Sequence, residues 1–318
     1  MDADVVKRQP PYYESRFIRA NDPDRARALW LRWTLLMPTT GAPVADSWVM
    51  LFDPDGAGNR ALKQPFPIDQ ADFGDETWTA CIGATCIDDH AASGTVTGAR
   101  WDLQITPGDE APVKLLTDRA YKARFPAAKT MVRHPLARFD GHIELHHADV
   151  QVDRWTGSVN HNWGRRHTPA YAFGQVCGFD DAPESSLEIV TARAAIGPVS
   201  LPAATLLVLC HDGRQLAARS MLDARHTRGE YRPFSWSFGA RLGDVTVDGE
   251  ITASPGDIIG LTYTDTNGEP KYCYNSALAT CRIRLSGKGI AATDLSATRR
   301  AMFEILTDAR DDRVRLLA

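Results

Sequence analysis

The sequence predicts an all-β protein built from two consecutive antiparallel β-barrels. Runs in which apolar and polar residues alternate recur at roughly 8- to 12-residue spacing, with turn-forming residues between them. No segment shows the strand–helix alternation of a parallel sheet. At 318 residues the chain is long for one hydrophobic core, so two barrels would each take about half of it. A barrel of about eight strands can hold one small ligand.

In the first half, four segments carry this prediction. Both faces of residues 29–36 are largely apolar, which predicts a strand that is covered on both sides. Residues 93–108 predict a one-sided strand, because Trp101, Leu103 and Ile105 alternate with polar residues. Residues 107–135 contain several prolines and little periodicity, so we expect a long loop that folds over a barrel mouth. Asp140-Gly141 has the chemistry of a tight hairpin turn.

The second half continues the same pattern. Residues 205–222 predict a hairpin with Asp212-Gly213 at its tip, and residues 245–251 predict a one-sided strand. Residues 297–306 fit both helical and strand spacing, and their strand neighbours favour a closing strand. Trp236 alternates with serines on a further strand, and we expect it to contact the ligand.

Composition excludes several classes of protein. Apolar residues make up 43% and charged residues 24% of the chain, as in ordinary globular proteins. The net charge is −4 and no run of Lys or Arg exceeds a pair, which argues against nucleic-acid binding. No apolar signal-peptide core and no stretch of about 18 apolar residues is present. We therefore expect a cytoplasmic protein without a transmembrane segment. Peripheral contact with a membrane is compatible with this expectation.

The cysteines and histidines do not predict a metal site. The six cysteines have no paired C-x-x-C spacing, and no carboxylate lies at a familiar ligand spacing from the histidines. We expect the cysteines to be small buried residues of a reducing compartment, while the sequence leaves open whether Cys81 and Cys86 are bridged. No glycine-rich phosphate loop opens a helix, so we expect no cofactor and no metal.

The most informative stretch runs from Gly157 to Asp181 and reads GSVNHNWGRRHTPAYAFGQVCGFDD. On a strand, alternate residues share a face, so His161 and Trp163 point together and Asn162 points the opposite way. We therefore expect His161 and Trp163 to line one cavity and Asn162 to face neighbouring backbone.

After a turn, the alternation resumes in this stretch. Tyr171, Phe173, Gln175 and Cys177 fall on one face, and only small residues and a valine fall on the other. A face of aromatic and hydrogen-bonding groups backed by small residues is unusual for a core strand. It predicts the wall of a ligand cavity.

This stretch resembles the signature of the tocopherol cyclase and carotenoid 1,2-hydratase (hydroxyneurosporene synthase) superfamily, which is close to G-x-x-x-H-N-W-G followed by H and then Y-A-W/F. The matching residues are Gly157, His161, Asn162, Trp163, Gly164, His167, Tyr171 and Ala172. A weaker similarity covers ANDPDRARALWLRWTLL and SWVMLFDPDG near the N-terminus. The resemblance implies two lipocalin-like barrels, residues 1–164 and 165–318, with a ligand cavity at or near their junction.

The resemblance also implies an activity. Members of the superfamily cyclise, hydrate or isomerise long apolar polyenes and isoprenoids, as in carotenoid biosynthesis, and some accelerate Diels–Alder closures. Hydratases of the family are expected to carry Tyr and Asp two residues apart on the strand after the signature. Here Ser186 and Glu188 have that spacing, and this departure argues against carotenoid hydration itself.

Protonation of an isolated alkene needs an acid and a stabilised cation. A carboxylic acid in an apolar site has a raised pKa, and a tryptophan face stabilises a nearby cation by roughly 0.5–2 kcal/mol. We therefore predict His161 or Glu188 as the acid and Trp163 as the aromatic face. The predicted ligand contacts, besides Trp236, are Asn162, Tyr171, Phe173 and Gln175.

Structural roles for these residues and functions other than catalysis remain open. His161 beside Trp163 is also explained as a hydrogen-bonded polar group of the core, and His167 as a partner of the turn at Pro169. A lipocalin-like carrier of a hydrophobic small molecule needs the cavity but no acid, and a partner-binding β scaffold needs neither. The sequence favours an enzyme over both alternatives, and it does not identify the substrate.

Overall fold

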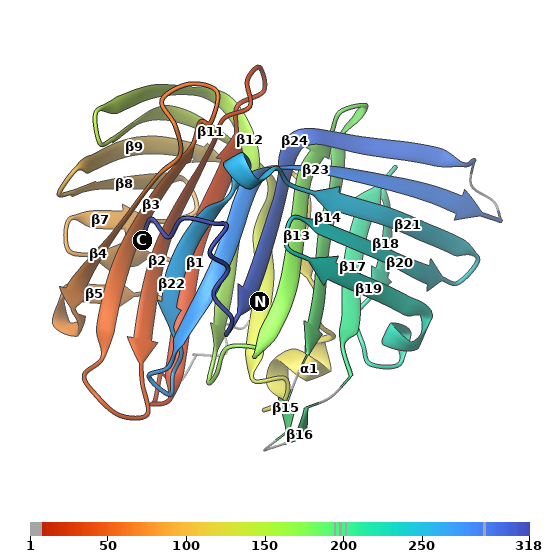
Figure 1. Cartoon of the computed structure of the whole chain (residues 1–318), viewed down its shortest axis with the longest axis horizontal. Coiled ribbons are helices and arrows are strands. Elements are labelled where there is room, and N and C mark those ends of the chain that lie inside the picture. The colour runs from red at the N-terminus through yellow and green to blue at the C-terminus, as the bar shows by residue number, and fades with distance from the viewer. Residues whose placement is uncertain (1–7, 194, 197–198, 201, 289–290) are drawn as a thin grey trace.

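The structure, a computed structural model, describes residues 8–193, 195–196, 199–200, 202–288 and 291–318. Strands account for 64% of the chain and helices for 5%. As predicted, the chain is nearly all β and forms two nearly closed antiparallel barrel-like sheets in tandem (Figure 1). Among the described residues, no helix is both long enough and apolar enough to cross a membrane.

The first sheet has twelve strands in the order β4-β3-β2-β1-β12-β11-β9-β8-β7-β6-β5, with β10 paired to β11. Its strands are β1 (Tyr12–Asn21), β2 (Ala28–Met37), β3 (Val44–Phe52), β4 (Arg60–Pro67), β5 (Ala71–Phe73), β6 (Ala80–Ile82), β7 (Thr85–Ile87), β8 (Ala91–Val96), β9 (Ala99–Thr106), β10 (Val113–Lys114), β11 (Ala128–Leu145) and β12 (Ala148–Gly164). The helical turns η1 (Ile68–Gln70) and α1 (Asp118–Lys122) lie between them.

The second sheet has ten strands in the order β18-β17-β14-β13-β24-β23-β21-β20-β19, with β22 paired to β23. Its strands are β13 (Ala170–Phe179), β14 (Ala182–Arg193), β17 (Ala204–His211), β18 (Arg214–Ala218), β19 (Thr227–Arg232), β20 (Ser235–Leu242), β21 (Val245–Thr252), β22 (Ile259–Thr264), β23 (Pro270–Gly287) and β24 (Thr293–Thr307). The short pair β15 (Ala195–Ile196) and β16 (Val199–Ser200) forms its own sheet, and the remaining turns are η2 (Asp223–His226) and η3 (Pro255–Asp257).

Several sequence predictions are confirmed in these strands. The predicted strand 93–108 is divided into the end of β8, a turn at 97–98 and β9, and within β9 buried and exposed residues alternate strictly as expected. β2 is buried along most of both faces. The predicted hairpin is β17–β18, and the ambiguous segment near the C-terminus is the strand β24.

Two loop predictions need correction. Residues 107–135 are not one long loop, because they include β10, α1 and the beginning of β11. Asp140-Gly141 is not a hairpin turn, because it lies inside β11 at a register shift. Gly141 instead allows β9 to lie close to β11, since a Cβ on Gly141 would lie 2.1 Å from the carbonyl oxygen of Asp102 on β9. The turn itself falls at His146–His147, both of which have positive φ.

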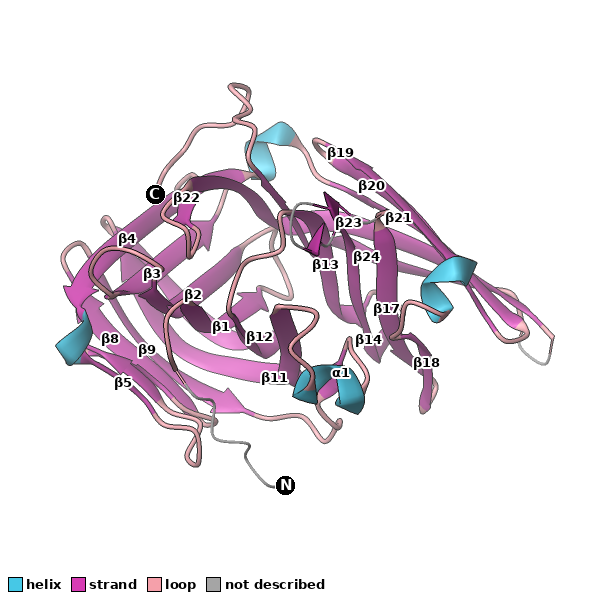
Figure 2. Cartoon of the chain, turned by 90° about the horizontal axis from the view of Figure 1, so that it is seen from below, coloured by secondary structure: helices cyan, strands magenta, loops and turns pink. Residues whose placement is uncertain are grey.

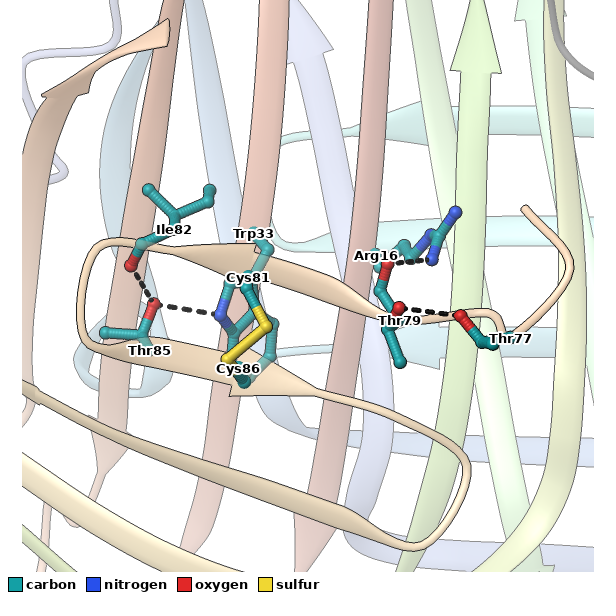
Figure 3. Close-up of a disulfide and its surroundings, with 8 residues drawn as sticks. All are labelled: Arg16, Trp33, Thr77, Thr79, Cys81, Ile82, Thr85 and Cys86. Carbon is teal, nitrogen blue, oxygen red and sulfur yellow. Dashed lines mark hydrogen bonds between the residues drawn. A yellow bond between two sulfur atoms is a disulfide. The ribbon is translucent and has the colours of Figure 1, made fainter. Parts of the chain in front are cut away.

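A disulfide joins Cys81 and Cys86, a point that the sequence left open. The two residues face each other across the β6–β7 hairpin (Figure 3). The Trp33 indole donates a hydrogen bond to Thr85 Oγ1 at 3.0 Å and thereby ties the hairpin to the barrel core. The four other cysteines are free, and only Cys210 among them is not fully buried.

The two sheets meet along their central strands (Figures 1 and 2). They share one buried apolar cluster. Side chains on the outer face of β1–β3 pack against β22, β23 and β24 in this cluster. Its members include Phe17, Trp30, Trp48 and Met50 from the first sheet and Ile259, Leu261, Cys273 and Leu306 from the second. The C-terminal residues Leu317 and Ala318 pack against the same cluster. The sheets are therefore held together by a common core.

Candidate functional site

A cavity of about 340 Å³ lies between the two barrels. This volume is at the low end of the range of ligand pockets, about 300–1,000 Å³. Its walls include Tyr13, Phe17, Trp30 and Arg32 from the first sheet, Tyr171, Phe173, Met302 and Glu304 from the second, and Leu115, Phe125 and Met221 from the connecting segments. The walls are mostly apolar, with a few polar groups among them.

Two other cavities have similar volumes of about 380 Å³. One adjoins the junction cavity and shares Tyr13, Arg32, His167 and Tyr263 with it. The other lies in the second barrel beside the segment that follows β24. We regard the junction cavity as the candidate site because both barrels place buried charged side chains on its wall.

Glu304 on β24 is the acidic group of this cavity. Its side chain is only 6% exposed, and both carboxyl oxygens accept hydrogen bonds. The Tyr171 hydroxyl donates to one oxygen, and Asn275 Nδ2 donates to the other at 2.9 Å. Burial and the neighbouring Glu304 carboxyl raise the pKa of Tyr171 well above its ordinary value. Tyr171 therefore keeps its proton and donates it in the hydrogen bond to Glu304.

Arg32 on β2 is the cationic group. It is 7% exposed, and it donates to Ser15 Oγ and to the Tyr263 hydroxyl, each at 2.6 Å. Within the described part of the chain, its Nη2 makes no hydrogen bond and no carboxylate lies within 4.0 Å of the guanidinium. Burial alone would lower its pKa, but the surrounding tyrosine and carboxyl groups raise it. A buried guanidinium without a directly paired anion attracts an oxygen that carries negative charge.

His167 lies on the same wall. Its Nδ1 is 2.9 Å from Asp265 Oδ1, and its ring stacks on Tyr13 with centroids 3.9 Å apart. Burial lowers the pKa of His167 even though Asp265 opposes the shift. For Asp265, burial acts in the other direction, and the hydrogen bond from His167 lowers its pKa to about 2. The partner of His167 is thus Asp265 and not the turn at Pro169.

The signature residues divide between the two sides of β12. His161 and Trp163 share a face and stack with centroids 4.4 Å apart, but they point into the first barrel and not onto the junction cavity. There His161 Nε2 lies 3.0 Å from Glu14 Oε1, and burial lowers the pKa of His161. Asn162 lies on the opposite side, on the cavity wall, and accepts a hydrogen bond from the Thr130 hydroxyl at 2.7 Å.

Glu188 pairs directly with Gln175 across β13 and β14. Gln175 Nε2 donates to Glu188 Oε2 at 2.9 Å, and burial raises the pKa of Glu188 to about 8. The pair borders a separate space of only about 10 Å³. Tyr171 and Phe173, on the same face as Gln175, do line the junction cavity.

The face that carries Tyr171, Phe173 and Gln175 looks toward the first barrel and not into the second. Its reverse side packs tightly inside the second barrel, where a Cβ on Gly174 would lie 2.5 Å from Ile251 and 3.0 Å from Trp236. Trp236 itself is fully buried in that core and stacks on Phe303. It does not line the junction cavity.

Sequence reasoning did not select Arg32, Tyr263 or Glu304 as functional residues. The sequence nevertheless held a sign of Arg32 and Glu304. Each is a charged residue among apolar neighbours on a strand, and both faces of that strand segment are buried. Burial of such a charge is costly unless it is paired or functional.

Among the described residues, one group could offer ligands to a metal. The ligand atoms of Glu184, His211 and Asp212 lie within 4.8 Å of one another. Both carboxylates are exposed, and none of the three residues lines the junction cavity, so we assign no role to this group.

Comparison with known proteins finds sequence relatives that are described as uncharacterized and solved structures that share the fold of this chain. No family model matches the sequence. The uncharacterized proteins Rv0493c and MT0513 of two Mycobacterium tuberculosis strains are each 26% identical over 269 residues, which cover 84% of this chain and 79% of theirs.

Three solved structures are similar in fold. Kievitone hydratase from Nectria haematococca has a TM-score of 0.59 at 7% identity, over 93% of this chain and 88% of that one. CghA has a TM-score of 0.64 at 10% identity, over 95% and 90%. The AttH-like protein NE1406 of Nitrosomonas europaea has a TM-score of 0.56 at 11% identity, over 93% and 92%. The likeness shows that this tandem barrel-like fold also occurs in a protein named as a hydratase.

Proposed function

We propose that this protein is a cofactor-independent enzyme that hydrates, cyclises or isomerises an apolar polyene or isoprenoid in the junction cavity. One observation carries the proposal. The proton-bearing pair Tyr171–Glu304 from the second barrel and the unpaired guanidinium of Arg32 from the first lie on one apolar cavity. A resemblance of residues 157–172 to the cyclase and hydratase superfamily supports the same class of reaction.

The reaction class needs only proton transfer. In hydration, the Tyr171–Glu304 pair accepts a proton from water, the water oxygen bonds to one carbon of the double bond, and the pair returns the proton to the other carbon as the π bond breaks. In isomerisation or cyclisation, the same pair moves a proton while the π electrons form the new bond. Arg32 stabilises negative charge on a ligand oxygen during either step. Electrons are neither gained nor lost, so the proposal requires no redox cofactor.

The cavity restricts the ligand. A volume of about 340 Å³ is small for a long carotenoid, and it suits a shorter apolar chain or ring system that bears one oxygen. Glu188 and His161, the two acids that the sequence predicted, lie outside this cavity, and therefore in our proposal Glu304 accepts the proton and returns it to carbon. The cytoplasmic location stays a prediction, and the Cys81–Cys86 disulfide argues against it because such bonds are rare in reducing compartments.

Glu304→Gln tests the proposal. It keeps the shape of the side chain and removes the proton acceptor, so turnover should fall by about 10²- to 10⁴-fold. Binding of the fluorescent polyene cis-parinaric acid should change little. Turnover is measured by mass spectrometry over a panel of oxygenated polyenes and isoprenoids. The exposed Glu230→Gln serves as the matched control and should behave like the parent.

Two results would contradict the proposal. Full turnover by Glu304→Gln would remove Glu304 and return the acid role to Glu188 or His161. Binding of cis-parinaric acid without turnover of any panel member by the parent would favour the hydrophobic carrier.

A further inference from the structure

Exposed apolar side chains gather at the entrance of the junction cavity. Across the described residues, the large apolar side chains with high exposure are Phe125 at 40%, Met221 at 54% and Leu222 at 66%. Phe125 and Met221 line the cavity, and Leu222 directly follows Met221. Single exposed apolar residues are common, but a group confined to one entrance marks a contact surface.

Positive charge accompanies this group. Arg119 and Lys122 lie on α1, Arg124 precedes Phe125, and Arg225 lies on η2 just after Leu222. All four side chains are exposed, and none has an ion-pair partner in the part of the chain that the structure describes. This is a local excess of positive charge on a chain whose net charge is −4.

The acidic residues on the same two segments do not cancel this charge. Asp118 is bound by Lys114 at 2.7 Å. Asp223 accepts hydrogen bonds from the backbone N–H groups of Arg219 and Ser220 at 2.9 and 3.0 Å and keeps its negative charge, which is one against the four positive charges. The four basic residues therefore remain available to an outside partner.

We propose that this entrance rim, made of Phe125, Met221, Leu222 and the four basic residues around them, docks on the surface of an anionic lipid bilayer. Apolar side chains bury in the boundary between headgroups and acyl chains, while basic residues are attracted to anionic headgroups. An apolar ligand then passes from the bilayer into the cavity without crossing water. The docking surface stands independently of the proposed catalysis, because a carrier would use it equally well.

Vesicle co-sedimentation tests the docking surface. The parent should pellet with vesicles of equal parts phosphatidylglycerol and phosphatidylcholine, and much less with phosphatidylcholine alone. Each basic residue near an anionic surface contributes about fivefold in binding, so Arg119→Gln with Arg124→Gln should weaken it by about 25-fold. Met221→Ser with Leu222→Ser should also release the protein from vesicles. The matched control removes two exposed arginines elsewhere, Arg100→Gln with Arg282→Gln, and should bind like the parent. Neither arginine has an ion-pair partner within 4.0 Å among the residues that the structure describes.

The failures are distinguishable. The proposal is wrong if the parent does not pellet with phosphatidylglycerol vesicles, or if the control pair loses as much binding as the rim pair. It is also wrong if Met221→Ser with Leu222→Ser instead dissociates a dimer of this chain in solution. Binding of cis-parinaric acid without vesicles, measured on the Arg119→Gln with Arg124→Gln variant, should equal that of the parent, because this readout reports the cavity and not the rim.

Discussion

Glu188 is a buried carboxyl group whose protonation should influence stability. Burial raises its pKa from an ordinary 4.5 to about 8, although the Gln175 hydrogen bond and the charge of Arg19 act in the opposite direction. Between these two pH values the folded protein holds a proton that the unfolded chain has lost. The free energy of unfolding therefore decreases as the pH rises through this window, by at most about 1.4 kcal/mol per pH unit.

Glu188→Gln should remove this pH dependence. The variant should resemble the parent near pH 5 and be more stable than the parent near pH 8.5, because no buried carboxylate has to form. Urea unfolding at several pH values measures the difference. The exposed Glu230→Gln should keep the slope of the parent, and a Glu188→Gln curve parallel to that of the parent would rule out this account of the carboxyl group.

At this scale, alternation along a strand was a reliable guide, but only to which residues share a face. It correctly grouped Tyr171 with Phe173 and Gln175, and His161 with Trp163. It did not tell which face would look into a barrel and which toward the other barrel, because both surroundings are buried. The face of β13 that carries Gly174 turns into the second barrel because it packs against Trp236 and Ile251, which are distant in sequence. Glu304 and Arg32 were missed for the same reason, since their shared cavity exists only after both barrels have formed.

The β6–β7 hairpin is the element in which a covalent bond supplements packing. Its strands have three residues each, and such short strands form few cross-strand contacts. The disulfide joins residues five positions apart, and closing a loop of this length should stabilise the fold by about 2 kcal/mol in the chain-entropy view.

Cys86→Ser should therefore lower the free energy of unfolding by about 2 kcal/mol. Treatment of the parent with dithiothreitol should have a similar effect, and the variant should not respond to the reductant. Thermal melts with and without dithiothreitol measure both effects. Cys210→Ser, which removes a free cysteine, should leave the response to the reductant intact. A parent melt that does not change on reduction would contradict a stabilising role for this bond.

The local sequence predicted one of the two Asp-Gly pairs correctly, and it predicted neither the role of the other nor the disulfide. The turn at Asp212-Gly213 was predicted correctly because no described neighbouring strand packs on its glycine, where a Cβ would have no described atom within 4 Å apart from the adjacent residues. The similar pair Asp140-Gly141 was misassigned, because its glycine accommodates a neighbouring strand that the local sequence does not reveal. The disulfide could not be predicted, since strand pairing alone decides whether Cys81 and Cys86 lie opposite each other.

For the whole molecule, the shared cluster and a buried polar network join the two barrels. Arg19 of β1 is fully buried and donates to Gln175 Oε1 at 2.8 Å and to the backbone oxygen of Arg300 at 3.1 Å. Gln175 Nε2 in turn donates to Asn160 Oδ1 of β12 at 2.8 Å. These contacts cross between the sheets, and breaking them would leave the Arg19 cation with Asn21 Oδ1 of its own strand in place of its full set of partners. The barrels should therefore unfold together.

Tryptophan fluorescence can test this coupling, because it reports almost entirely on the first barrel. All eight tryptophans except Trp236 precede residue 165. Leu261 belongs to the second sheet, on β22, and is fully buried in the shared cluster. Leu261→Ala should lower the free energy of unfolding by about 2–5 kcal/mol, and fluorescence should follow this loss together with far-UV circular dichroism. The exposed Leu222→Ala should leave both curves unchanged. Barrels that are independent would instead keep the fluorescence midpoint of the parent in Leu261→Ala while the dichroism transition splits in two, because only coupled barrels transmit a defect from the second sheet to the first.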